Sequence, residues 1–435
     1  MPVVARVTGR RGAFSGGFQL TATQQLAAPT EATAPTAPTR PWRIVLLLGS
    51  LIALGPLSID LYLPALPDLT GDLSASPSAV QLTLTGMLIG LGVGQLVIGP
   101  LTDIYGRRRP LLVGITVHVA ASLLCAVAPS IVVLDALRVL QGVGAAAASV
   151  VAMAVVRDLF TGSAAASVIS RLVMVMGLAP VLAPSLGSAV LEVGSWRTVF
   201  LVLAGLGVLL FTLALVALRE TLPAERRAAP GVRQTLRGYG VLLRDPTLVG
   251  FMMVASLTMA AVFAYVSGAS FVLQDGFGLD ERTFGLVFGV GAIGLIASSQ
   301  VNIALLRRVE PGAILSTALT VAALAGIVLL VDAVTGAGGI IGVLVPLWVI
   351  LAMVALCGPN ATALALAQHG DRAGAASALL GASQFAVGAL IAPLTGLGEA
   401  GSAVPMAATI AGALSLAAVL VRLVLRPGRA VVATA

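Results

Sequence analysis

The chain has 435 residues, of which 58% are hydrophobic and only 10% charged, whereas a soluble domain carries about 25% charged residues. Its net charge of +7 at pH 7 comes from arginines in short segments between apolar stretches, which argues against a nucleic-acid partner. About 20 apolar residues suffice to span a bilayer, and such stretches recur along the chain. We therefore predict an all-α membrane protein whose immediate partner is the lipid bilayer.

Residues 1–42 are polar and rich in Thr, Ala and Pro, so we expect a disordered cytoplasmic tail. Twelve apolar stretches follow, and they do not alternate in polarity as the strands of a membrane barrel would. Polar residues 219–245 separate six stretches from six. We expect one bundle over 43–218, a cytoplasmic linker, a second bundle over 246–426, and a tail over 427–435. The predicted helices are Arg43–Pro64, Ala79–Leu101, Pro110–Ala128, Ile131–Val155, Ala164–Leu191, Thr198–Leu218, Pro246–Leu273, Thr283–Leu306, Gly312–Val331, Ile340–Ala363, Gly374–Leu397 and Val404–Leu425.

The arginines predict the orientation, because short cytoplasmic loops carry an excess of basic residues. With the N-terminus inside, 21 arginines fall on the inner side and only Arg197 and Arg282 on the outer side. Arg138 and Arg171 lie within spans. Both termini are therefore expected in the cytoplasm.

The two halves repeat each other at an offset of 199 to 200 residues. Arginines 107 and 108 follow the second span as arginines 307 and 308 follow the eighth. Parallel six-helix repeats around a central cytoplasmic loop are typical of a large class of transporters. The glycines that repeat are Gly86, Gly90 and Gly94 in the second span, and Gly285, Gly289 and Gly294 in the eighth.

The loop after the second span reads GPLTDIYGRRR from Gly99 to Arg109. It resembles the signature of the major facilitator superfamily at every position of the pattern, and the resemblance implies the major facilitator fold of two six-helix pseudo-repeats. Asp103 is an anion able to cap a neighbouring helix, which the family implies is the eleventh span. Gly106 permits the turn, and Arg107 can reach the carboxylate of Asp158. These residues are expected to latch the two halves in one conformation.

Arg138 stands inside the apolar fourth span, where an arginine costs about 2.5–3.5 kcal/mol on insertion scales. Such a residue normally faces the interior of the protein or a water-filled cavity. The stretch with Arg138, Gln141 and Gly142 resembles the second signature of drug/proton antiporters, in which the arginine is implicated in proton coupling and substrate response. The alternative is that Asp135, three residues earlier, simply neutralises the charge.

The fifth span resembles the antiporter signature, a helix broken by glycine and proline. Gly177, Pro180, Pro184 and Gly187 match, while two glycines of the pattern are replaced here by Ala183 and Ser188. We expect the remaining residues to kink the helix.

Asp60 is the clearest acidic residue within a span, in the run GPLSIDLYLPALP from Gly55 to Pro67. Together with Val156–Phe160 and Ser195–Arg197, this run resembles the bicyclomycin/chloramphenicol-resistance subfamily. A carboxyl group removed from water can pick up a proton near neutral pH. We expect Asp60 to share a proton-coupling and substrate site with Arg138 and Gln141, since their depths in the membrane match. The alternative is that Asp60 caps the outer end of the first span.

Tyr62, Phe263, Tyr265 and Phe385 are candidates to line a cavity for flat, amphipathic solutes. We predict proton-coupled export of small amphipathic compounds such as drugs across the bacterial inner membrane, by a monomer that takes its energy from the proton gradient and uses no cofactor or metal. The alternative is an importer or metabolite symporter on the same fold. An enzyme is not expected, because catalytic motifs such as a His-Glu-x-x-His pair are absent.

Overall fold

The computed structural model describes residues 41–227, 232–367, 369, 372–397, 399 and 401–425. Within these ranges the secondary structure is helical, and twelve helices are long and apolar enough to cross a membrane, as predicted. They are α1 (Pro41–Asp60), α3 (Pro77–Tyr105), α4 (Arg108–Ala126), α5 (Ile131–Leu159), α6 (Gly162–Leu191), α7 (Trp196–Ala217), α9 (Pro246–Ser270), α10 (Glu281–Leu305), α11 (Pro311–Thr335), α12 (Gly339–Leu366), α13 (Ala373–Ile391) and α14 (Val404–Val424).

Several helices extend beyond the predicted apolar stretches, because hydrogen bonding continues through polar residues that hydropathy does not count. The clearest cases are α3, which continues to Tyr105, and α5, which continues to Leu159. Shorter helices complete the chain. Of the two expected tails, residues 1–40 and 427–435 lie outside the described ranges. These shorter elements are η1 (Leu63–Ala65), α2 (Leu66–Asp72), η2 (Ala224–Arg226), the amphipathic α8 (Val232–Leu242) in the linker, the π-helical η3 (Phe271–Gly276) and η5 (Ala392–Gly396).

Side-chain caps mark where several spanning helices begin. Ser76 accepts a hydrogen bond from the Ala79 N–H at the start of α3, and Asp280 accepts one from the Thr283 N–H at the start of α10. These caps satisfy donors that the first helical turn leaves free. Polar residues between the apolar stretches therefore set the helix starts.

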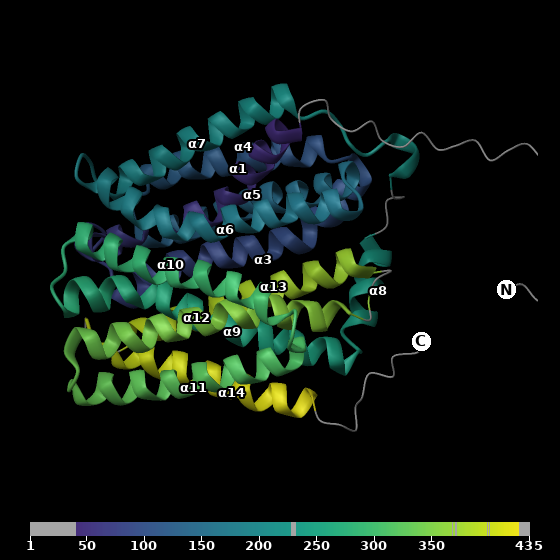
Figure 1. Cartoon of the computed structure of the whole chain (residues 1–435). Helices are drawn as coiled ribbons and strands as arrows, with labels where there is room; N and C mark the ends of the chain where they lie inside the picture. Colours follow the sequence, from purple (N-terminus) through teal and green to yellow (C-terminus); the bar gives the residue numbers. More distant parts are fainter. Residues whose placement is uncertain are drawn as a thin grey trace, which may run out of the picture. The chain divides into compact units, whose positions relative to one another are not determined.

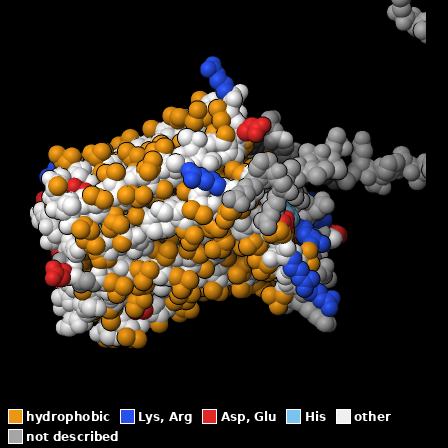
Figure 2. Space-filling view, turned by 90° about the horizontal axis from the view of Figure 1, so that it is seen from below, with side chains coloured by type: hydrophobic (Ala, Val, Ile, Leu, Met, Phe, Trp, Pro, Cys, Tyr) orange, Lys and Arg blue, Asp and Glu red, His pale blue; other side chains and the backbone are white. Residues whose placement is uncertain are grey.

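The first six spanning helices form one bundle and the last six a second, and the two meet where α3 packs against α13 and α6 against α10 (Figure 1). One apolar core contains residues of both bundles. The face shown in Figure 2 carries a broad band of hydrophobic side chains, and most of the arginines visible there lie beyond one edge of it.

We call the end of the bundles that carries the α3–α4 loop the motif end, and the other the opposite end. Direct hydrogen bonds join the two bundles at the opposite end, where α3 and α10 start and α6 and α9 finish. Polar side chains donate them to backbone carbonyls of the other bundle. The donor–acceptor pairs are Ser78–Gly396, Gln81–Ser267, Thr85–Ala389, Ser185–Gly285, Ser188–Glu281, Ser270–Leu63 and Gln274–Pro64.

Candidate functional site

Close packing of α3 against α5 determines where Arg138 lies. A Cβ atom at Gly90 would overlap the Val139 carbonyl oxygen, and one at Gly142 would overlap that of Met87. Only glycine lets the two backbones approach so closely, as is common between membrane helices. Arg138, one turn before Gly142, is thereby held against the interior of the first bundle.

Arg138 is completely buried and all of its hydrogen bonds go to neutral acceptors. Its Nη1 donates to the Ser58 carbonyl at 2.9 Å and to the Gln141 Oε1 at 2.6 Å, and its Nε donates to the Thr83 carbonyl at 3.3 Å. The Nη2 atom is buried without a hydrogen-bond partner. The positive charge is therefore solvated by dipoles from α1, α3 and α5 rather than neutralised.

Two aromatic rings complete the surroundings of this guanidinium. The Arg138 Cζ lies 5.0 Å from the centre of the Tyr62 ring and 5.7 Å from that of Phe200, within the range of cation–π attraction. The Tyr62 hydroxyl bonds the Thr83 hydroxyl at 3.0 Å. Tyr62 is fully buried, so the structure places it as a packing partner of Arg138 and not on a cavity wall.

Gln141 extends the polar network toward α4. Its Nε2 donates to the Ser122 Oγ at 2.7 Å, and that hydroxyl donates to the His118 carbonyl at 2.7 Å. The His118 Nδ1 lies 3.3 Å from the Gln141 carbonyl oxygen. Sequence reasoning missed Ser122 and Thr83. Their only signal was a hydroxyl inside an apolar span, which many helices satisfy with their own backbone.

Neither nearby acid pairs with Arg138. Asp135 makes no ion pair within 4 Å in the described part of the chain, and its buried Oδ1 has no hydrogen-bond partner. The expectation that Asp135 neutralises the arginine through contact is thus not met in this conformation. Asp60 also forms no ion pair with Arg138, although Ser58, two residues earlier, binds it through its carbonyl.

Asp60 is the last residue of α1, at a point where the chain meets the second bundle. Its side chain is in the interior, the residue being 5% exposed, and no hydrogen bond to it occurs among the described residues. Three residues later, the Leu63 carbonyl accepts the Ser270 hydroxyl of α9 at 2.7 Å. Among the described residues no group of three acidic, His or Cys side chains is placed to hold a metal ion.

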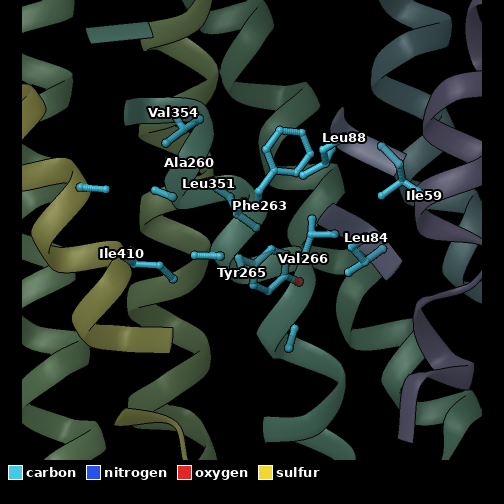
Figure 3. Packing of buried hydrophobic residues seen from close by; sticks show 14 of the residues in the cluster. Ile59, Leu84, Leu88, Ala260, Phe263, Tyr265, Val266, Leu351, Val354 and Ile410 are labelled. Carbon is cyan, nitrogen blue, oxygen red and sulfur yellow. The ribbon is translucent and has the colours of Figure 1, made fainter. Parts of the chain in front are cut away.

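The aromatic residues of α9 lie at the contact between the bundles. Tyr265 stacks on Phe288 of α10 with ring centres 4.9 Å apart, and Phe263 meets Phe385 of α13 at 5.9 Å. Figure 3 shows Phe263 and Tyr265 on the side of the second bundle that faces the first. Apart from Tyr62, the expected cavity residues therefore belong to two aromatic pairs of the second bundle.

The motif loop forms a second polar cluster, around Arg107. Its Nε donates to the Asp158 Oδ2 at 2.9 Å, and its Nη1 donates to Asp103 and, at 3.0 Å, to the Thr102 hydroxyl. The contact between Arg107 and Asp158 is the one expected from the sequence. All of these residues belong to the first bundle, so in this conformation the cluster does not join the two halves. The contact of Asp103 with the start of α13 stays a prediction.

Glu220, just after α7, is a member of this cluster that sequence reasoning missed. Its carboxylate accepts hydrogen bonds from the backbone N–H groups of Arg107 (2.8 Å) and Arg108 (3.2 Å), and from those of Thr221 and Leu222 (both 3.0 Å). Burial alone would raise its pKa, but these four donors hold the pKa below its ordinary value. Glu220 therefore caps α4 as an anion.

The glycines of the motif differ in their surroundings. Gly106 has φ +84°, a conformation that other residues rarely adopt, and a Cβ there would collide with the Glu220 carboxylate. At Gly99 a Cβ would meet nothing within 4 Å. The carbonyl of Gly99 accepts the Thr102 hydroxyl at 2.7 Å.

The broken-helix residues of the fifth span all lie within α6. Pro180 and Pro184 interrupt its hydrogen-bond ladder. A Cβ at Gly187 would overlap the Leu61 carbonyl, so this glycine lets α6 touch the segment that follows α1. Gly177 lies outside the residues whose side-chain surroundings are described.

Comparison with known proteins agrees with this geometry. The sequence profile of the Major Facilitator Superfamily matches residues 46–393. This chain is a member of that superfamily. It is 38% identical over 367 residues to the MFS-type transporter YdgK of Bacillus subtilis, covering 84% of this chain and 91% of the relative. It is 32% identical over 373 residues to the bicyclomycin resistance protein homolog of Haemophilus influenzae, covering 84% and 92%.

A solved structure confirms the fold of this superfamily member. The D-xylose-proton symporter superposes with a TM-score of 0.69 at 15% identity, covering 88% of this chain and 97% of that one. At that identity the likeness concerns the fold alone. Membership and the twelve spans establish a multi-pass transporter of the bacterial inner membrane and not an enzyme.

Proposed function

We propose that this transporter exports small amphipathic compounds, drugs among them, in exchange for protons. The observation that carries the proposal is Asp60, a buried carboxyl group without an ion pair among the described residues, at the end of α1 where the two bundles meet. Such a group is the best-placed proton acceptor of the described spans. The relatives named for bicyclomycin resistance and multidrug resistance support a drug-like cargo.

The surroundings of Asp60 favour an apolar cargo. Tyr265 and Phe288 offer stacked rings in the neighbouring second bundle, and Phe263 with Phe385 adds a second pair. Aromatic faces bind flat solutes with little demand for polar partners. A sugar would need several amide and acidic groups, which these spans largely lack.

We infer that Arg138 couples cargo to protons through α1. Its Nη1 bonds the Ser58 carbonyl, so a shift of α1 that exposes Asp60 also changes how the arginine is solvated. Cargo and proton then weaken each other's binding by the same factor, as linkage requires.

We further propose that the motif end faces the cytoplasm, because the arginines gather there. The seven hydrogen bonds at the opposite end then seal the outer side of the transporter in this conformation. Alternating access would break these bonds and close the motif end instead.

The test is Asp60→Asn in everted membrane vesicles, with chloramphenicol in the cargo panel. The neutral variant should insert normally but lose uphill accumulation and cargo-driven proton release. Asp68→Asn is the matched control, since Asp68 lies on the same stretch but is exposed. Uphill transport with proton exchange in Asp60→Asn would refute the assignment. Accumulation in right-side-out cells would instead favour the importer or symporter.

A further inference from the structure

The second half of α3 contains a backbone acceptor that lacks its helical donor. Pro100 lies inside this helix, and proline has no N–H to bond the carbonyl four residues earlier. That carbonyl belongs to Leu96. In a membrane protein an unpaired carbonyl is costly, so another donor usually satisfies it.

The donor comes from the linker between the bundles. Tyr239, on the short helix α8, donates its hydroxyl to the Leu96 carbonyl oxygen at 3.2 Å. Tyr239 is buried on the amphipathic α8, as is Leu242 three residues later. Burial and the nearby charge of Asp103 both raise the pKa of Tyr239, so its hydroxyl remains a donor at physiological pH.

The same helix also touches the second bundle. α8 packs against α13, and Figure 1 shows it beside the ends of the bundles. At the motif end no hydrogen bond joins the two bundles directly within the described ranges, in contrast to the opposite end. At this end the linker helix therefore bridges the two bundles, because it is hydrogen-bonded to α3 and packed against α13.

We propose that Tyr239 is a positioning residue through which α8 acts as a strap. Its hydroxyl docks on the carbonyl that Pro100 leaves free, and this holds α3 and the second bundle at their present separation at the motif end. The strap releases when the transporter changes conformation. The inference rests on the proposed function only in that the chain alternates between two conformations.

The experiment measures that separation without cargo. Spin labels on Arg109→Cys and Arg307→Cys, both exposed at the motif end, report the distance between the bundles by pulsed electron resonance. The buried Cys125 and Cys357 are first replaced by serine. Tyr239→Phe should change the ratio of the two distance populations about fivefold, as expected for one lost hydrogen bond. Tyr105→Phe, an exposed tyrosine at the end of α3, should change nothing.

The second variant tests whether Tyr239 binds the Leu96 carbonyl because Pro100 leaves it free. Pro100→Ala restores an N–H that bonds Leu96 within the helix, so it should shift the populations as Tyr239→Phe does. The double variant should show no further shift. Unchanged distances in Tyr239→Phe, or additive effects of the two substitutions, would overturn the proposal. Because no cargo or proton gradient is used, failure of the export proposal would leave this result intact.

Discussion

Two arginines of the first bundle, Arg138 and Arg107, are both largely buried but are stabilised in opposite ways. Arg107 lies between the carboxylates of Asp103 and Asp158, so its charge is neutralised by contact. Arg138 meets only carbonyls, an amide and aromatic rings. A buried ion surrounded by dipoles keeps its field, whereas a paired ion loses most of it. From this contrast we propose that Arg138 couples cargo to protons and that Arg107 gives mechanical support.

The largest expected effect comes from Arg138→Ala. It leaves the Gln141 Oε1 and the Ser58 carbonyl without their donor, and each lost hydrogen bond costs about 1–3 kcal/mol of stability. It also removes the positive charge that we propose couples cargo to protons. Cargo affinity measured against pH in detergent should lose its pH dependence. Arg138→Lys should keep part of it, because a lysine retains the charge but cannot fork among three acceptors. A native pH profile in Arg138→Ala would show that Arg138 does not couple cargo binding to protons.

Arg107→Ala should slow transport without abolishing cargo binding. Removing one partner of a largely buried ion pair costs about 3 kcal/mol, because Asp158 keeps only the Thr221 hydroxyl as a bonding partner here. We expect uptake rates in vesicles to fall at least about tenfold, the factor that 1.4 kcal/mol represents. Arg109→Ala, at an exposed position in the first turn of α4, is the control. Lost cargo affinity with normal rates would assign Arg107 to binding instead.

Glu220→Gln should have a smaller, pH-dependent effect on stability. Because the pKa of Glu220 is held below its ordinary value, its contribution is present above that ordinary value and is lost as pH falls through the lowered one. A helix cap is worth about 1 kcal/mol. The difference in Tm between the native chain and the variant should be largest near neutral pH and shrink below about pH 4. A difference that does not change with pH would show that the charge is irrelevant to the cap.

Asp135→Asn should change least. With no ion pair to Arg138 in the described structure, the substitution is expected to leave the pH profile of cargo binding native and stability within about 0.5 kcal/mol. The measurement is the same titration used for Arg138→Ala. If the two variants shift the profile identically, Asp135 and Arg138 act as a static pair. Arg138 would then not differ from Arg107 in the way proposed.

The architecture and the family could be predicted from the amino-acid sequence alone. The twelve apolar stretches, the repeat of glycines and arginines, and the motif loop are all patterns of the sequence itself. The sequence also located Arg138, Arg107 and Asp158 as functional candidates. Hydropathy responds to the cost of placing each side chain in lipid, which each segment carries independently of its neighbours.

Which side chains contact each other could be learned from the tertiary structure but not from the sequence. The tertiary structure separated Asp60 from Arg138, turned Tyr62 into a packing partner of the arginine, and brought Glu220 from beyond α7 to the start of α4. It also placed Tyr239 on the carbonyl that Pro100 leaves open. These contacts depend on helix rotation and on close approaches such as that of Gly90 to α5. A sequence pattern records neither, because many partners could satisfy the same buried dipole and packing selects one.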